Sequence, residues 1–233
     1  MRLAIISDIH ANLEALTKAL EIIGQLAVHE IVCLGDVVGY GANPNECVEL
    51  VRTQCSFILK GNHDAAAVDL SVAETFTTNA RLSAVWTHEM LAKENRDFLT
   101  SLPYTQEKEK SLYVHATPCN PPEWEYILTE YDAKSAFRCF EQAICFIGHT
   151  HTPVIFDENG KSKMIRRDSR SIVNVGSVGQ PRDGNPKLSF GVFDSTRWEY
   201  ENIRSAYDIK NASKKIADAG LPRGLAERLW VGI

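Results

Sequence analysis

Two histidines lie one residue apart in the sequence GHTHTP, at residues 148–153, directly after the apolar run ICFI. In an extended segment, side chains at positions i and i+2 point to the same side, so His149 and His151 would present their imidazoles to one space. This arrangement suits a metal ion, but a single pair is a weak signal because histidines also occur close together by chance. A metal site requires further donors at comparable positions.

Acidic, amide and imidazole side chains follow four other apolar segments in the same way. Five of the seven histidines occur at such ends, whereas His29 and His88 do not and are interpreted as ordinary polar side chains. Polar residues are common in turns after strands, which explains each cluster alone but not the whole set. The candidate metal donors at these ends are Asp8, His10, Asp36, Asn62, His115, His149 and His151.

Seven donors are too many for one metal ion and suit two ions, provided that one carboxylate bridges them. Each ion would then have four protein ligands and keep positions open for water and substrate. Nitrogen and oxygen donors without a thiolate favour manganese, iron, zinc, cobalt or nickel. Two carboxylates facing two divalent ions leave positive charge, which would attract an anion although the chain has a net charge of -5. Such a centre is suited to the hydrolysis of phosphate esters.

His63 remains outside this donor set, beside Asn62. Its position indicates a role in the reaction, either protonating the leaving alkoxide or stabilising the transition state. Asp64 is expected to orient the His63 ring. A purely structural histidine is the alternative interpretation.

Alternating elements in the first third of the chain would position these residues. Apolar runs at 3–7, 30–36 and 57–64 predict strands, and apolar residues at helical spacing predict helices at 11–24 and 43–52. Alternation of strands and helices predicts a parallel sheet. The ends of its strands would converge on one crevice.

Helices and further strands are predicted for the rest of the chain. A helical insertion at about 66–99 has an apolar face formed by Leu82, Val85, Trp86, Met90 and Leu91. Strands are predicted at 111–116, 144–151, 152–156, 171–176, 188–194 and 197–203. A C-terminal tail at about 206–233 is expected to be helical, and we expect a single domain over residues 1–233.

The composition is that of an ordinary globular protein, with 233 residues of which 44% are hydrophobic and 24% charged. The negative net charge gives no general attraction to nucleic acids or anionic membranes. No apolar run approaches the roughly 20 residues that span a bilayer. We therefore expect a cytoplasmic monomer or homodimer without nucleic-acid or membrane partners. Free thiols are expected for all six cysteines, which are Cys33, Cys47, Cys55, Cys119, Cys139 and Cys145.

Five motifs, in their order and spacing, resemble those of the calcineurin-like metallophosphoesterases, and they are most similar to the small bacterial and archaeal phosphodiesterase branch. The motifs are DIH (8–10), GDVVGYG (35–41), GNHD (61–64), HATP (115–118) and GHTH (148–151). The resemblance covers roughly residues 1–195. It implies an α/β (α+β) fold in which two mixed sheets form a β-sandwich flanked by helices, in four layers αββα.

The resemblance also implies how the donors divide between two divalent or trivalent metal ions. One ion would be held by Asp8, His10, Asp36 and His151, and the other by Asp36, Asn62, His115 and His149. Asp36 would bridge the ions, and His63 corresponds to the catalytic histidine of the family. Arg182, in the sequence GSVGQPR, is a candidate for placing a substrate phosphate.

The expected function is hydrolysis of a small phosphodiester or nucleotide-type substrate by attack of a hydroxide that bridges the metal ions. Alternative substrates are phosphomonoesters, phosphoproteins and dinucleoside polyphosphates. A non-catalytic scaffold of the same fold is disfavoured by the presence of His63. A mononuclear metal sensor would bind a single ion per chain.

Overall fold

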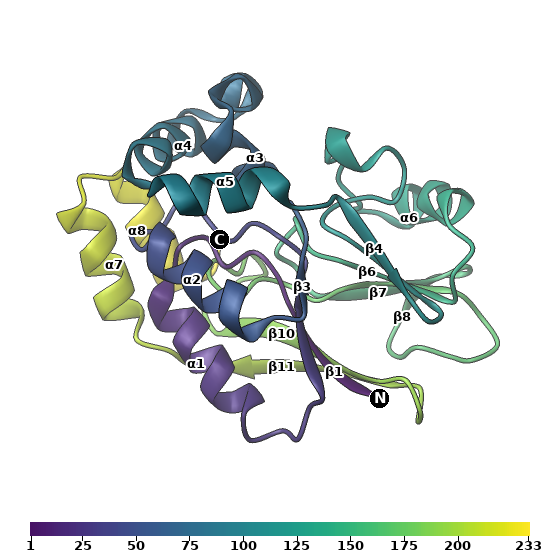
Figure 1. Cartoon of the computed structure of the whole chain (residues 1–233). Helices are drawn as coiled ribbons and strands as arrows, with labels where there is room; N and C mark the ends of the chain where they lie inside the picture. Colours follow the sequence, from purple (N-terminus) through teal and green to yellow (C-terminus); the bar gives the residue numbers. More distant parts are fainter.

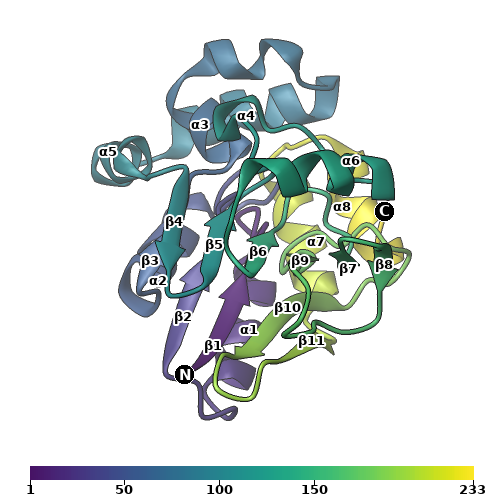
Figure 2. The same cartoon turned by 90° about the vertical axis from the view of Figure 1, so that its right-hand side faces the viewer.

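A computed structural model describes residues 1–233, and its core is a pair of β-sheets packed face to face (Figures 1 and 2). The first sheet consists of β1 (Arg2–Ile6), β2 (Glu30–Cys33), β3 (Phe57–Ile58), β10 (Leu188–Asp194) and β11 (Glu199–Ser205). Its strand order is β11-β10-β1-β2-β3. The three N-terminal strands are parallel, and β10 is antiparallel to both β1 and β11.

The second sheet consists of β4 (Thr105–Lys108), β5 (Ser111–Val114), β6 (Ile144–Ile147), β7 (Val154–Asp157), β8 (Gly160–Ser162) and β9 (Ser171–Asn174). Its strand order is β4-β5-β6-β9-β7-β8. The central strands β5, β6 and β9 are parallel, and the outer pairs are antiparallel. Both sheets are therefore mixed, as the resemblance implied.

Helices cover the outer faces of both sheets (Figure 1). On the side of the first sheet lie α1 (Leu13–Ile23), α2 (Pro44–Gln54), α3 (Asn62–Val68), α4 (Thr78–Met90), α5 (Lys93–Ser101), α7 (Ile209–Asp218) and α8 (Arg223–Val231). The second sheet is covered by α6 (Glu130–Ala136). Short 3₁₀ helices are η1 (Leu70–Thr75), η2 (Pro121–Glu123) and η3 (Phe137–Cys139). No helix is both long and apolar enough to cross a membrane.

Side chains alternate across both sheets, and this alternation creates the layers. On β1, Ile6 packs with residues of α1 and α2, whereas Ile5 faces the second sheet. On β6, Phe146 lies between the sheets and Cys145 packs with residues of α6. The predicted four-layer αββα arrangement is confirmed.

One predicted strand differs from the structure near the motif GNHD. The predicted strand 57–64 is too long, because β3 ends at Ile58 and Asn62 begins α3. Gly61 is extended at the N-cap of this helix, and the Asp64 carboxylate accepts its N–H. A side-chain acceptor at this position favours the start of a helix over continuation of the strand.

The apolar face predicted for the helical insertion is wrong for three of its five residues, whereas Leu91 is buried in the core and Trp86 packs against another apolar cluster. The segment divides into four short helices, and Leu82, Val85 and Met90 are 53%, 37% and 50% exposed. The helix α4 instead buries its small side chains, which are Ala80, Ser83, Ala84 and Thr87. Ala84 packs with Ala66 of α3 in an alanine cluster, so small side chains allow the helices to approach closely.

The expectation of free thiols is wrong for two of the six cysteines. Cys119 and Cys139 form a disulfide with their Cα atoms 5.3 Å apart, whereas the thiols of Cys33 and Cys145 are free and buried. The disulfide joins the loop after β5 to η3 across 20 residues of sequence. Sequence spacing did not reveal this contact, because it depends on how the loop folds back onto the sheet.

We expect the double substitution Cys119→Ser and Cys139→Ser to lower the free energy of unfolding by about 3 kcal/mol, because the disulfide closes a loop in the unfolded chain. For a chain of this length, the melting temperature should fall by roughly 6–12 °C. Differential scanning calorimetry measures the change. Reduced wild-type protein should match the variant, and Cys55→Ser is the matched control. A variant as stable as the oxidised wild type would contradict the prediction.

Candidate metal centre and active site

Six of the seven predicted donors lie in loops that follow strands at one edge of the sandwich, the seventh, Asn62, is the first residue of α3, and all are buried. The loops after β1, β2 and β3 come from the first sheet, and those after β5 and β6 come from the second. The structure brings six of the donors into two groups whose ligand atoms lie within 4.8 Å of one another. The groups are Asp8, His10, Asp36 and His151, and Asp36, His115 and His149.

A left-handed backbone directs most of these side chains. The φ angles of Asp8, His10, Asp36, His149 and His151 lie between 51° and 65°. Residues other than glycine rarely adopt this conformation, and it occurs preferentially where function requires it. The extended geometry predicted for the last two histidines is therefore wrong, since β6 ends at Ile147 and the two rings point into different groups.

Two glycines allow the chain to approach the carboxylates closely. A Cβ atom on Gly61 would lie 2.1 Å from Oδ1 of Asp36, and one on Gly148 would lie 2.3 Å from Oδ2 of Asp8. Any other residue at either position would displace a candidate ligand. The glycines of GNHD and GHTH are thus required by the packing around the site.

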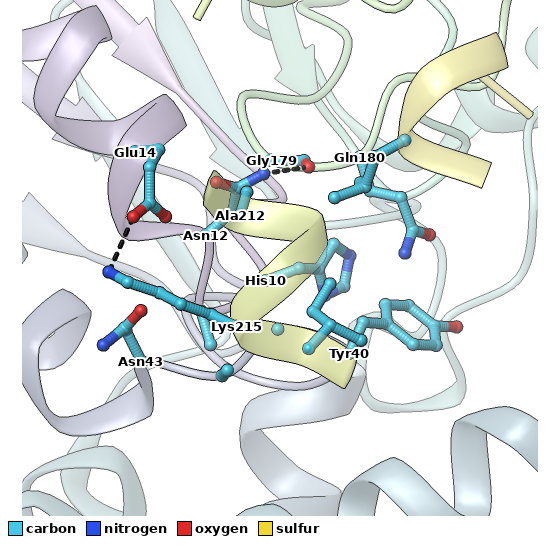
Figure 3. Close-up of a pocket in the computed structure, with 14 residues that line it drawn as sticks. His10, Asn12, Glu14, Tyr40, Asn43, Gly179, Gln180, Ala212 and Lys215 are labelled. Carbon is cyan, nitrogen blue, oxygen red and sulfur yellow. Dashed lines mark hydrogen bonds and ion pairs between the residues drawn. The ribbon is translucent and has the colours of Figure 1, made fainter. Parts of the chain in front are cut away.

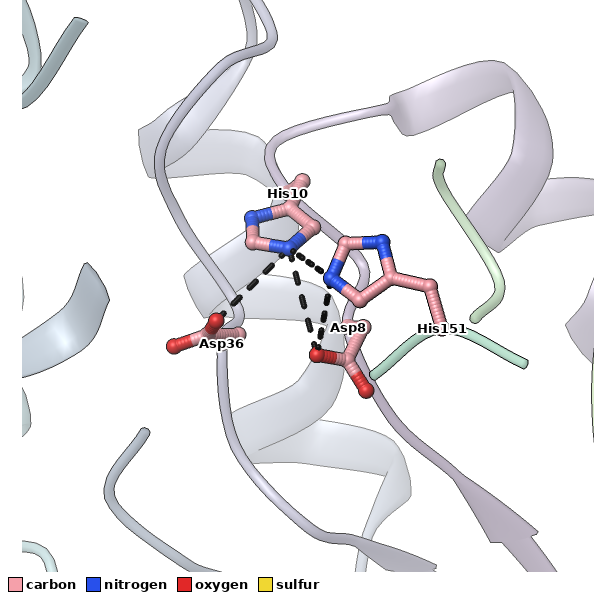
Figure 4. Close-up of side chains that lie close together, drawn as sticks. All are labelled: Asp8, His10, Asp36 and His151. Atoms are coloured by element: carbon pink, nitrogen blue, oxygen red, sulfur yellow. Dashed lines mark hydrogen bonds and ion pairs between the residues drawn. The ribbon is translucent and has the colours of Figure 1, made fainter. Parts of the chain in front are cut away.

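The first group contains two imidazole nitrogens that face each other (Figure 4). The Nε2 atoms of His10 and His151 are 3.0 Å apart, and Nε2 of His151 is 3.2 Å from Oδ1 of Asp8. Nδ1 of His10 lies 3.1 Å from the Val38 carbonyl, and Nδ1 of His151 bonds to the Gln180 carbonyl. A carbonyl accepts only from a protonated Nδ1, so both Nε2 lone pairs face the centre. A cation between them removes their mutual repulsion.

In the second group, too, a main-chain carbonyl orients a histidine ring. Nδ1 of His115 donates to the Leu34 carbonyl at 3.1 Å, so its Nε2 faces the cluster. This Nε2 lies 3.3 Å from Oδ1 of Asn62, which brings the seventh predicted donor to the group. Nε2 of His149 is buried without a hydrogen-bond partner, and the ring of Tyr126 stacks on this imidazole at 4.1 Å. A buried nitrogen of this kind fits a metal ligand.

Asp36 is shared between the two groups through one oxygen. Its Oδ2 is 3.6 Å from Nε2 of His10 and 3.5 Å from Nε2 of His115. Its Oδ1 accepts the main-chain N–H of His63 at 2.8 Å. The two oxygens therefore have separate partners, and Oδ2 has the position of a bridging ligand.

The charges of the cluster also fit a cation. Burial alone would raise the pKa of Asp8, but His151 and His115 hold that pKa well below its usual value. Burial would lower the pKa of His115, but Asp36 and Asp8 raise it to about 9. Two buried carboxylates thus require nearby positive charge, which protons or metal ions can supply.

Comparison with known proteins identifies the family. The sequence profile of the calcineurin-like phosphoesterase superfamily domain matches residues 1–197. The chain belongs to this superfamily. The resemblance seen in the five motifs is confirmed, and the buried aspartate and histidine cluster lies in a family of metal-dependent proteins.

Relatives match the chain over its whole length. The uncharacterized protein MJ0912 of Methanocaldococcus jannaschii is 40% identical over 240 residues, covering 99% of this chain and 98% of the relative. The crystal structure of a metallophosphoesterase from Sphaerobacter thermophilus is 37% identical, with a TM-score of 0.91 and coverage of 100% and 99%. A hypothetical protein from Pyrococcus horikoshii, PH1004, shares the fold at 21% identity, with a TM-score of 0.84 and coverage of 100% and 98%.

His63 lies beside the metal groups at the first turn of α3 and is buried. Its ring centroid is 5.0 Å from that of His10, 4.3 Å from that of Tyr40 and 4.9 Å from that of Phe76. Burial lowers the pKa of His63 to about 4. The ring is therefore neutral near pH 7, and its Nδ1 has no hydrogen-bond partner.

The predicted role of Asp64 in orienting the His63 ring is wrong. The carboxylate of Asp64 makes no hydrogen bond to that ring and instead accepts four main-chain N–H groups. These belong to Asp36, Val37, Val38 and Gly61, at 2.8, 2.9, 3.2 and 3.0 Å. Asp64 therefore fixes the loop after β2, and with it the position of Asp36. Sequence proximity to His63 suggested the wrong partner because backbone donors leave no trace in residue types.

An open cavity of about 370 Å³ adjoins the metal groups, with Asn62, His63 and His149 on its wall. Arg182 lines the same cavity, and its Nη2 donates to Oε1 of Gln180 at 2.8 Å. The sequence interpretation missed nine cavity residues, among them Tyr40, Phe76, Trp124, Tyr126 and Arg228. Of these, only Tyr40 lies within a recognised motif, GDVVGYG.

A second crevice lies on the other side of His10 and Tyr40, between α1 and α7 (Figure 3). Its volume of about 10 Å³ is room for a single water molecule. Lys215 and Glu14 form an ion pair of 2.6 Å at this crevice. This ion pair joins the C-terminal helix α7 to α1. The larger cavity is therefore the candidate substrate site.

We expect Asp64→Asn to weaken metal binding and lower stability, because an amide replaces one carboxylate oxygen with a donor that faces main-chain N–H groups. Loss of buried hydrogen bonds to the Asp64 carboxyl group should lower the free energy of unfolding by about 3 kcal/mol. Metal content by mass spectrometry and chemical denaturation measure the two effects.

Asp132→Asn is the matched control for this substitution. Asp132 also accepts main-chain N–H groups, from Leu128 and Thr129, but it lies at the start of α6 outside the metal groups. Its replacement should leave the metal content unchanged. Equal metal content in Asp64→Asn and wild type would show that Asp64 does not position Asp36.

Proposed function

We propose that this protein is a dinuclear-metal-dependent phosphoesterase that hydrolyses a small phosphodiester or nucleotide-type substrate. The observation that carries the proposal is Oδ2 of Asp36, which lies 3.6 and 3.5 Å from histidine nitrogens of two separate donor groups beside an open cavity. Seven ligands with one shared carboxylate suit two ions of manganese, iron, zinc, nickel or cobalt. Bound metal ions would supply Lewis acidity and activate a water molecule for attack on phosphorus.

Residues of the chain itself support this reaction in defined ways. The hydrogen bonds from Nδ1 of His10, His115 and His151 to main-chain carbonyls hold each Nε2 toward the centre. His63 faces the cavity as a neutral imidazole, which favours donation of a hydrogen bond to the transition state over delivery of a stored proton. Of the two roles considered for His63, we propose stabilisation of the transition state.

The cavity favours a small substrate over a phosphoprotein. Its volume of about 370 Å³ lies at the lower end of the range for sites that enclose small molecules. Of the four Phe, Tyr and Trp side chains on its wall, Phe76, Trp124 and Tyr126 offer surfaces for a planar leaving group. Nucleotide-type esters therefore fit this site best.

The division of ligands between two ions can be tested with paired variants. We expect wild-type protein to bind two manganese ions, and His149→Ala or His151→Ala to bind one, because each removes a ligand of a different group. His115→Ala combined with His149→Ala should still retain one ion, since both belong to one group. His149→Ala combined with His151→Ala should retain none.

Metal content per chain, measured by inductively coupled plasma mass spectrometry, distinguishes these cases. The exposed His29 lies outside both groups, and His29→Ala is the matched control that should keep both ions. Equal metal content in the two double variants would contradict the proposed division. A single ion in the wild type would favour the mononuclear sensor.

Turnover is the direct test of the proposed function. With Mn²⁺, we expect hydrolysis of bis-p-nitrophenyl phosphate that is abolished by EDTA and restored by metal. His63→Asn should lower kcat by about 10²–10⁴-fold with metal content unchanged, because the ring acts on the reacting groups. Parallel assays with p-nitrophenyl phosphate and diadenosine tetraphosphate separate diesters from the alternative substrates.

The outcomes separate the enzyme class from the role of His63. Absence of turnover with all three esters, in protein shown to contain metal, would support a scaffold. Full kcat in His63→Asn would refute the role of His63 and leave the enzyme class intact.

A further inference from the structure

Two arginines flank the ring of Tyr40 at the edge of the cavity. The Cζ atom of Arg182 is 5.7 Å from the Tyr40 ring centroid, and that of Arg228 is 5.9 Å from it. Both side chains are half-buried and line the cavity. Arg228 comes from α8, outside residues 1–197 that match the family profile.

Neither guanidinium pairs with an aspartate or glutamate side chain in the structure. Arg182 donates to the side-chain amide of Gln180, and Nε of Arg228 donates to the main-chain oxygen of Ile233 at 2.6 Å. The carboxylate of Glu123 also lines the cavity but makes no ion pair with either arginine. All ten ion pairs that lysines and arginines form with aspartates or glutamates lie elsewhere, including those of the neighbouring residue Asp183 and of Arg223 on the same helix.

The positive charges of the Arg182 and Arg228 guanidinium groups repel each other. Burial and the neighbouring charge of Arg182 lower the pKa of the Arg228 guanidinium. An arginine is strongly suited to binding phosphate oxygens, since its planar fork can donate two parallel hydrogen bonds. An anion held between the two side chains would remove their repulsion and satisfy their free N–H groups.

The position of Tyr40 relates this pair to the metal centre. The ring of Tyr40 packs against His10 at 4.7 Å and against His63 at 4.3 Å, between ring centroids. The ring of Tyr40 therefore lies between the two arginines and the histidines His10 and His63. A phosphate bound by the metal groups and a second phosphate of the same molecule can occupy the cavity together.

We propose that Arg182 and Arg228 form a subsite for a second phosphate group of the substrate, next to the phosphate that is hydrolysed. The substrate class is then a phosphate ester with at least two phosphate groups, such as a nucleoside or dinucleoside polyphosphate, rather than an ester of a single phosphate. This inference rests on the proposed phosphoesterase function, because it places the first phosphate at the metal groups.

Binding of AMP and of α,β-methylene-ADP, a non-hydrolysable analogue that stands for ADP in this comparison, tests the subsite without turnover. The protein is loaded with Mn²⁺, free Mn²⁺ is held equal in all titrations, and dissociation constants are measured by isothermal titration calorimetry. Wild-type protein should bind ADP about tenfold more tightly than AMP, because charge-assisted hydrogen bonds to the second phosphate are gained. Arg228→Gln should remove most of this preference by weakening ADP alone.

Two further variants separate a subsite from a structural role of Arg228. Arg228→Lys keeps the charge but not the two-nitrogen fork, so it should retain part of the preference. Arg223→Gln is the matched control on the same helix, since the Arg223 side chain is 89% exposed and paired with Glu227. Its ADP preference should equal that of wild type, and circular dichroism verifies that α8 is intact in every variant.

Turnover gives an independent measurement. Arg228→Gln should lower kcat/KM for a substrate with several phosphates by about tenfold, mainly through KM, with less than a threefold effect on bis-p-nitrophenyl phosphate. Equal losses for both substrates, or equal affinity of wild type for AMP and ADP, would overturn the subsite. ADP preference in a protein without any esterase activity would support the subsite and refute the proposed function, so the two failures are distinguishable.

Discussion

The shared carboxylate of Asp36 is the constraint on which the arrangement of this site depends. Its Oδ1 accepts the N–H of His63, and this contact leaves Oδ2 free between the two donor groups. The N–H of Asp36 is in turn held by Asp64, whose carboxylate also fixes the next two residues of the loop. The loop after β2 and the first turn of α3 therefore form one hydrogen-bonded unit. A carboxylate that bridged two ions without such support could rotate and release one of them.

Both donor groups cross the interface between the two sheets. In the first group, His151 comes from the second sheet and the other members come from loops of the first sheet. In the second group, His115 and His149 come from the second sheet, whereas Asp36 comes from the first. The apolar layer between the sheets, which includes Leu34 directly before the loop of Asp36, thus sets the distance between ligands. Any ion that binds only the folded site also stabilises the packing of one sheet on the other.

Sequence patterns predicted those features that depend on residue type and short spacing. The apolar runs before Asp8 and Asp36 placed the donors at strand ends, and the five motifs indicated the sandwich. Features that depend on backbone donors or distant contacts were not predictable in this way. Asp64 is an example, because its four hydrogen-bond donors are main-chain N–H groups, which every residue type except proline has. The sequence therefore suggested only its neighbour His63 as a partner. Arg228 was not predicted as a cavity residue, because the helical periodicity of α8 does not show which part of the protein the polar face of this helix lies against.

Different physical constraints act on the centre and on the cavity wall. At the centre, left-handed backbone, glycine contacts and histidine bonds to carbonyls fix each ligand, so a single substitution disturbs several others. On the wall, the half-buried Arg228 extends from a helix that packs on the rest of the fold through the buried side chains Leu225 and Leu229. Residues at such positions can change without altering the core of the helix. In the proposed function, the candidate metal ligands are thus separate from the candidate substrate-selecting arginines, of which Arg182 lies between β9 and β10 and Arg228 lies on α8.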